Sequence, residues 1–114
     1  MPYFKISMTK LLSGEQKHEG MKSMHQLVVD ELQKPDRFIM TAIEDSRSMH
    51  FGLSDDPLAF VEFKSIGLKD TKKLSAAICD LIEKQFEIEP NRVYIEFTDE
   101  PRNMFGHNRT TFEK

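Results

Sequence analysis

The sequence predicts an α+β fold, an α/β sandwich in which two β-α-β units build one four-stranded sheet with both helices on one face. Three observations predict it. Residues 34–40 are echoed by residues 89–95, about 55 positions later, and each copy carries a proline followed by an apolar run. Two stretches show the three- and four-residue apolar spacing of amphipathic helices. The segments around them have the β-branched and aromatic bias of strands.

The repeat also sets the domain organisation. One unit used twice nearly fills the 114 residues, which suit one domain rather than two. We therefore expect a single domain over residues 1–114, with pseudo-repeats at about 2–55 and 57–112.

The first unit begins with a strand at residues 3–8. Residues 14–32 are expected to form the helix that follows. Their apolar side chains recur on one side, at Met21, Met24, Val28 and Leu32, and the charged side chains are left exposed to solvent. Pro35 halts helical structure, so residues 38–44 are expected to form the next strand.

The second unit repeats this order. Residues 58–65 are apolar enough for a strand in the middle of a sheet. Residues 70–82 predict a helix with Asp70 as its N-cap. A proline turn follows, and residues 92–98 complete the unit as a strand.

The far face of this sheet has no predicted cover within the chain. Helical crossovers between parallel strands place both helices on one face. Five apolar strand residues are interpreted as supplying both faces: Val61, Phe63, Val93, Ile95 and Phe97. A second copy of the chain is the simplest cover, so the pattern predicts a homo-oligomer. Residues 47–52 and 104–112 remain as short edge pieces that could pair with a neighbouring chain.

Composition and charge exclude several classes of partner. Sixteen basic and nineteen acidic residues give a net charge of −3, without a run of five like charges, so neither nucleic acid nor a membrane surface is expected to bind. The N-terminus lacks the apolar core of a signal peptide, and no stretch approaches the roughly 18 apolar residues of a membrane span. A cytoplasmic location is therefore expected.

Motifs for metals and cofactors are not found. Cys79 is the only cysteine, which excludes an internal disulfide or a cysteine zinc site, and its place beside a helical apolar stripe indicates a core residue. His18 and His25 are seven residues apart, the wrong spacing for a helical metal pair. No phosphate-binding glycine loop or nucleophilic serine motif occurs. No metal or cofactor is expected.

The unusual feature is Pro2. A small second residue allows the initiator methionine to be removed, and the proline that remains is a secondary amine. An α-amine in water titrates near 7.7 to 8.0, and an apolar pocket beside a cation disfavours its charged form. Such an amine is suited to take up protons at neutral pH.

A series of short motifs runs along residues 2–112. In order, they are Pro2-x-Phe4, Lys34-Pro35-x-x-Phe38-Ile39-Met40, Met49-x-Phe51-Gly52, Asp56-Pro57-x-Ala59, Lys64-Ser65-Ile66-Gly67, Arg92-Val93-Tyr94-Ile95 and Gly106-x-Asn108-x-Thr110-Thr111-Phe112. Together they resemble the macrophage migration inhibitory factor family of the tautomerase superfamily. The resemblance implies a tautomerase fold assembled as a symmetric homotrimer.

The resemblance also implies roles for single residues. Pro2 would be the catalytic base, and Lys34 would attract a substrate carboxylate and lower the pKa of Pro2. Ser65 and Ile66 would line the pocket, with the Ile66 N–H offered to the substrate, and Tyr94 would enter from the adjacent subunit. The other pocket positions are Phe38, Glu96, Phe105 and His107. Without the resemblance, Lys34 is a cation at a helix C-terminus, Ile66 a core residue and Tyr94 a strand aromatic.

Several positions depart from the family pattern. Glu96 replaces an asparagine, His107 a tryptophan, Lys64 a histidine, and Phe105 takes an aliphatic position. Glu96 would place a carboxylate near the site, so the resemblance leaves the substrate preference open. The vertebrate CxxC pair corresponds to residues 58–61, which lack cysteine, so thiol oxidoreductase activity is not expected.

Two functions remain open at this point. The first is a keto-enol tautomerase of small aromatic α-keto acids, such as phenylpyruvate, and of dopachrome-like compounds. The second is a cytokine-like protein that binds a receptor protein and retains the pocket as a vestige, which requires secretion without a signal peptide. Ser46, at the position of the family's acidic receptor-mimicking loop residue, weakens the second.

Overall fold

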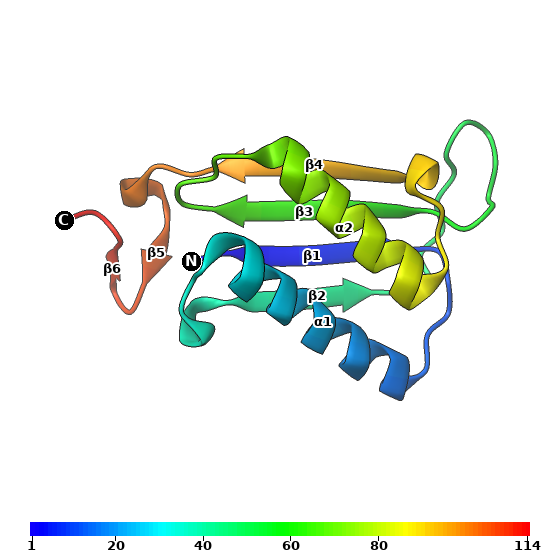
Figure 1. The fold of residues 1–114 in the computed structure, drawn as a ribbon, viewed down its shortest axis with the longest axis horizontal. Helices are drawn as coiled ribbons and strands as arrows, with labels where there is room; N and C mark the ends of the chain where they lie inside the picture. Colours follow the sequence, from blue (N-terminus) through cyan, green and yellow to red (C-terminus); the bar gives the residue numbers. More distant parts are fainter.

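Four strands form one mixed sheet, and two helices lie side by side across one of its faces (Figure 1). The computed structural model describes residues 1–114, in the order β1 (Tyr3–Met8), α1 (Gly14–Leu32), β2 (Met40–Glu44), β3 (Ala59–Ser65), α2 (Thr71–Phe86) and β4 (Val93–Asp99). The sheet order is β2-β1-β3-β4, with β2 parallel to β1, β4 parallel to β3, and β1 antiparallel to β3. The predicted α+β fold with both helices on one face is confirmed.

Local capping explains where the helices begin and end. Ser13 and Gln16 form a capping box at the start of α1, and Asp70 accepts the Lys73 N–H at the start of α2, as predicted. Helix α2 continues four residues beyond the predicted end at 82, because no residue breaks it before Glu87, whose left-handed φ of 57° ends it. Neither helix carries an apolar run that could span a bilayer.

The strands that follow each proline begin later than predicted. After Pro35, residues Asp36–Phe38 form a short 3₁₀ helix, so β2 begins at Met40 rather than at 38. Pro90–Arg92 form the equivalent turn before β4, which runs over Val93–Asp99 rather than 92–98. The fixed φ of proline suits the first turn of a helix, and this turn delays the strand.

The core lies between the sheet and the helices, and α1 approaches it most closely at Gly20. A Cβ placed on Gly20 would lie 2.6 Å from Cζ of Phe86 and 3.1 Å from Cδ1 of Ile43. Phe86 is almost fully buried, so its ring has little room to move aside. Helix α1 can therefore pack at this depth only because residue 20 lacks a side chain.

We expect Gly20→Ala to destabilise the protein, although alanine favours helices. Overpacking costs about 1–3 kcal/mol, while the gain in helix propensity is about 1 kcal/mol. The thermal midpoint should fall by a few degrees, whereas Gly14→Ala in the same helix, where nothing lies within 4 Å of the added Cβ, should leave it unchanged or raise it. A midpoint for Gly20→Ala at or above that of the wild type would contradict this packing.

The apolar strand residues lie on one face, not on both as predicted. Val61 and Phe63 are two positions apart on β3 and fully buried, and the register pairs Val61 with Ile95 and Phe63 with Phe97. Val93 pairs with buried Ala59, so all five predicted residues point toward the helices. The two-residue period of a strand requires this arrangement.

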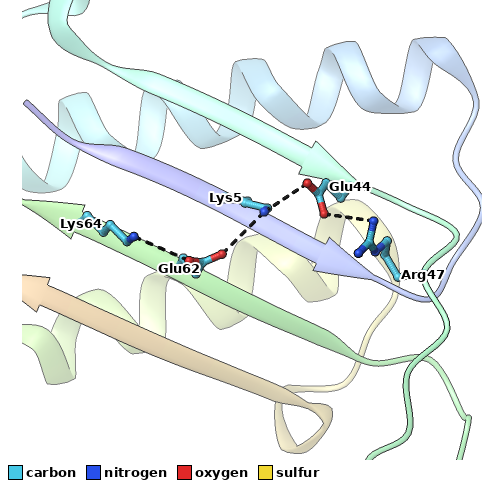
Figure 2. Close-up of polar contacts among 5 residues, drawn as sticks. All are labelled: Lys5, Glu44, Arg47, Glu62 and Lys64. Atoms are coloured by element: carbon cyan, nitrogen blue, oxygen red, sulfur yellow. Dashed lines mark ion pairs between the residues drawn. The ribbon is translucent and has the colours of Figure 1, made fainter.

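The open face of the sheet is instead polar and charged. Figure 2 shows Lys5 on β1 between Glu44 on β2, at 3.1 Å, and Glu62 on β3, at 3.7 Å. Lys64 extends the row by contacting Glu62 at 3.8 Å, and Arg47 contacts Glu44 at 3.5 Å. The hydrogen bond with Glu44 raises the pKa of Lys5. These ion pairs link β2, β1 and β3 on a face that can remain exposed to solvent.

The two predicted edge pieces differ in structure. Residues 104–112 contain a small hairpin of β5 (Gly106–His107) and β6 (Thr110–Thr111), which lies beyond the end of the sheet near the N-terminus (Figure 1). Residues 47–52 form no strand, and only Phe51 bridges to Ser54. The guanidinium of Arg92 holds this loop by donating hydrogen bonds to three carbonyl oxygens: those of Phe51, Ser54 and Asp56.

Candidate functional site

The N-terminus, the turn before β2 and the C-terminal hairpin enclose a cavity of about 200 Å³. Pro2, Phe38, Phe105 and His107 line it, so the structure brings together four of the site residues predicted from the sequence. Most of the lining is apolar. The cavity is smaller than the roughly 300–1,000 Å³ of pockets for drug-sized ligands, which suits a molecule with a single ring.

Aromatic packing gives this cavity its shape. The rings of His107 and Phe112 stack with an interplanar angle of 4° and centroids 5.7 Å apart. Phe38 meets both rings edge-on, at 5.6 Å and 5.9 Å, and Phe105 contacts Phe112 at 6.0 Å. Such contacts fix ring orientations. The hairpin is therefore held against the turn before β2, although some 70 residues separate them in the sequence.

Pro2 immediately precedes β1. Its side chain is fully buried, and its carbonyl oxygen accepts a hydrogen bond of 3.1 Å from the Met40 N–H. Met1 covers it and forms part of the cavity wall. Burial, assisted by the nearby charge of Lys34, lowers the pKa of the Met1 amine from 8.0 to about 6. An N-terminal amine at this end of the chain is therefore easily deprotonated.

Lys34 lies near the N-terminus but faces a second cavity. Its ammonium group donates a hydrogen bond of 3.1 Å to the Ile66 carbonyl oxygen. The side chain lines a groove of about 460 Å³ between the end of α1 and the start of α2, which also includes Glu31 and Asp70. Its charge influences the terminal amine, while its hydrogen bond ties α1 to the end of β3.

Ser65 and Ile66 lie at the end of β3, beside the N-terminus. The antiparallel register pairs Tyr3 with Lys64, so the next step along both strands brings Pro2 opposite Ser65. Ile66 is buried, and the Ser65 hydroxyl is fully buried without a hydrogen-bond partner in the chain. A buried hydroxyl without a hydrogen bond is costly, but neither Ser65 nor Ile66 lines the Pro2 cavity.

Tyr94 and Glu96 do not join this cluster. Both lie on the open face of β4, and Tyr94 pairs with Phe60, which pairs with Ser7 near the opposite end of β1 from Pro2. Five residues of strand span roughly 16 Å, so Tyr94 of one chain cannot reach Pro2 of the same chain. The Tyr94 ring is 63% exposed and packs on Phe51 at 4.6 Å.

The sequence interpretation missed Arg37, Met40 and Phe112 as members of the Pro2 cavity. Met40 and Phe112 belong to the motifs that carried the family resemblance, and Arg37 stands next to Phe38 in one of them, which was the available signal. Cys79 lies outside the core as a half-buried residue, contrary to the prediction; burial and the nearby Asp80 and Glu83 raise its thiol pKa. No group of three His, Cys, Asp or Glu side chains is arranged to hold a metal ion.

Comparisons with known proteins agree on one family. The family model described as "Macrophage migration inhibitory factor (MIF)" matches residues 1–113. The macrophage migration inhibitory factor of Xenopus tropicalis is 34% identical over 116 residues, and the homolog from Brugia malayi is 30% identical over 115; each alignment covers 98% of this chain and 99% of the relative.

Solved structures show the same similarity. The macrophage migration inhibitory factor homologue from Prochlorococcus marinus superposes with a TM-score of 0.91 at 27% identity, covering 97% of this chain and 99% of that one. The protein from Trichinella spiralis gives a TM-score of 0.87 at 27% identity, covering 96% of this chain and 99% of that one. The similarity extends over nearly the whole chain.

Proposed function

Because this chain belongs to the macrophage migration inhibitory factor family, within the tautomerase superfamily, we propose that it is a keto-enol tautomerase of small aromatic α-keto acids of the phenylpyruvate type and of dopachrome-like compounds. The observation that carries the proposal is the position of Pro2, buried at the end of β1 in an aromatic cavity where a terminal amine has a lowered pKa. Measurement of phenylpyruvate ketonisation by the processed protein tests it.

The base in this mechanism is the nitrogen of Pro2 after removal of Met1. While Met1 is attached, that nitrogen belongs to a tertiary amide and has no basicity. Once freed, it takes a proton from the carbon next to the substrate carbonyl, the electron pair forms the C=C bond, and negative charge develops on the carbonyl oxygen. Delivery of that proton to the carbonyl oxygen gives the enol, and the reverse sequence is the ketonisation that the assay measures, so the reaction requires no metal or cofactor.

The groups beside Pro2 have complementary tasks in the proposed reaction. The Ile66 N–H would stabilise the developing oxyanion, and Ser65 lies across from Pro2 at the end of β3. Phe38, Phe105 and His107 hold the aromatic ring of the substrate. Burial, with the positive charge of Lys34 as the smaller contribution, lowers the pKa of the Met1 amine, and in the proposed enzyme the same two effects favour the neutral form of the Pro2 amine.

We expect removal of the Lys34 charge to shift the pH profile upward. A cation lowers the pKa of a nearby amine, so Lys34→Ala should raise the pKa of the Pro2 amine, and the acid limb of kcat/KM should move to higher pH. Lys34→Gln separates charge from hydrogen bonding, because it can still donate to the Ile66 carbonyl. Both variants should shift the limb; unshifted profiles would assign Lys34 a purely structural role.

We further propose that the chain acts as a homotrimer. The outer edges of β2 and β4 are unpaired within the chain, which leaves backbone groups free to extend a neighbour's sheet. Met40 and Tyr94 are more than 60% exposed at these two outer strands. Closed symmetry would satisfy the same edges on every subunit and bring Tyr94, with Glu96 near it, to the Pro2 cavity of the next chain. Light scattering should give about three times 13.3 kDa.

A second candidate function is signalling through a receptor protein. The relative from Xenopus tropicalis is itself named a macrophage migration inhibitory factor, and its similarity covers nearly the whole chain. In this alternative the cavity is a vestige, and the protein would have to be secreted to reach the receptor. A variant lacking the Pro2 base distinguishes the two, because it would lose turnover but retain receptor binding.

A further inference from the structure

Two cations lie near the N-terminus, and only one of them lines the Pro2 cavity. The Lys34 ammonium is hydrogen-bonded to the Ile66 carbonyl and lines the adjoining groove. Arg37 is part of the wall of the 200 Å³ cavity itself, together with Pro2 and the aromatic residues. A negatively charged group bound in that cavity therefore meets Arg37 rather than Lys34.

The guanidinium of Arg37 packs against an aromatic ring but forms no ion pair. Its guanidinium carbon lies 4.7 Å from the centre of the Phe38 ring, a cation–π contact that fixes the group over a ring held by His107 and Phe112. None of the chain's ion pairs involves Arg37. The neighbouring carboxylate of Asp36 is occupied by His25 on α1, at 2.9 Å. The guanidinium therefore keeps its donors free for a ligand.

We propose that Arg37 binds the carboxylate of the substrate, and that Lys34 acts only on the pKa of the base. This assignment rests on the proposed tautomerase function and narrows it to aromatic acids. The planar guanidinium offers two parallel N–H groups that match both oxygens of a carboxylate, which an ammonium group cannot do. The aromatic ring of such an acid then lies against Phe38 and the hairpin, with the carbon beside its carbonyl facing Pro2.

Kinetics with a charged and a neutral substrate test whether Arg37 binds the carboxylate while Lys34 affects only the pKa of the base. Arg37→Gln should raise KM for phenylpyruvate about tenfold or more, with little change in kcat, and should leave the KM of methyl phenylpyruvate unaltered. Arg37→Lys should recover only part of the loss. Lys34→Gln should shift the pH profile without changing the preference for acid over ester. Equal effects of Arg37→Gln on acid and ester, or none on either, would overturn the assignment.

A matched control removes a positive charge from the hairpin that packs against the turn carrying Arg37. Arg109 lies in the exposed β5–β6 turn and does not line the cavity. Arg109→Gln changes the net charge by the same amount as Arg37→Gln, so it reports any effect of overall charge on an anionic substrate. It should behave as wild type with both substrates.

A binding measurement separates this inference from the proposed function. Phenylacetate cannot serve as a keto-enol substrate, and phenylacetamide differs from it by the absence of charge. By NMR titration, the processed wild type should bind phenylacetate at least about tenfold more tightly than phenylacetamide, and Arg37→Gln should abolish the difference. This result would support Arg37 even if no turnover were found. No preference for phenylacetate in the wild type would refute it, even if turnover were present.

Discussion

Replacement of Pro2 by glycine should lower the turnover of phenylpyruvate by at least about tenfold while the protein remains folded. Glycine also permits removal of Met1, so the variant still carries a terminal amine in the same cavity. That amine is primary, and the glycine backbone is more flexible than that of proline. The amine is therefore oriented less often for proton transfer with the substrate carbon. Initial rates give kcat and KM, and circular dichroism verifies the fold.

A one-residue insertion provides the matched control. An alanine placed between Met1 and Pro2 leaves Ala-Pro at the N-terminus after processing, which keeps the proline ring but turns its nitrogen into a tertiary amide. Turnover should fall at least as far as in Pro2→Gly. Mass spectrometry of both proteins and of the wild type verifies that Met1 has been removed. Wild-type turnover in either variant would remove Pro2 from the mechanism.

Mixing two inactive variants should restore about one quarter of the wild-type activity. Pro2 and Tyr94 lie at opposite ends of the sheet within one chain, so a site that uses both must combine two chains. In a random one-to-one assembly of Pro2→Gly and Tyr94→Ala chains, each site has one chance in four of receiving an intact Pro2 and an intact Tyr94. Tyr94 is mostly exposed, so its truncation should be tolerated by the fold.

The mixture also identifies the assembly that the site needs. Chains should be unfolded together and refolded, or co-expressed with different tags, so that subunits exchange fully. Each variant treated alone supplies the baseline, and light scattering supplies the mass of the hybrid. Activity no higher than the baseline, in hybrids of verified composition, would show that Tyr94 does not complete a neighbour's site.

Local signals in the sequence were sufficient to predict the fold class and the order of its helices and strands. The apolar spacing of residues 14–32 predicted α1 to the residue, and Asp70 marked the start of α2, because caps and periodicity depend only on neighbours within one or two turns. The strand beginnings after Pro35 and Pro90 were misplaced by up to two residues. A proline turn and the first residues of an extended strand look alike until the sheet partners are known.

Which face a strand residue occupies was decided only by the pairing of strands. Val61 and Phe63 share a face because they are two positions apart, but only the register with Ile95 and Phe97 shows that both pairs point toward the helices. The registers of β1 with β2 and with β3 place Lys5 between two glutamates on the open face. Cross-strand neighbours lie up to 61 residues apart in the chain, as Tyr3 and Lys64 do, so no local pattern could reveal them.

The sequence by itself determined the order of the elements, and through its motifs it identified the family and pointed to Pro2 as the candidate base. The tertiary structure decided where the two cations near Pro2 lie. It holds Lys34 on the Ile66 carbonyl and leaves Arg37 free at the cavity, a distinction that depends on the meeting of three segments distant in the chain. Lys34 forms a hydrogen bond with Ile66 only because the folded chain brings the two residues together, so this contact cannot be inferred from either residue alone.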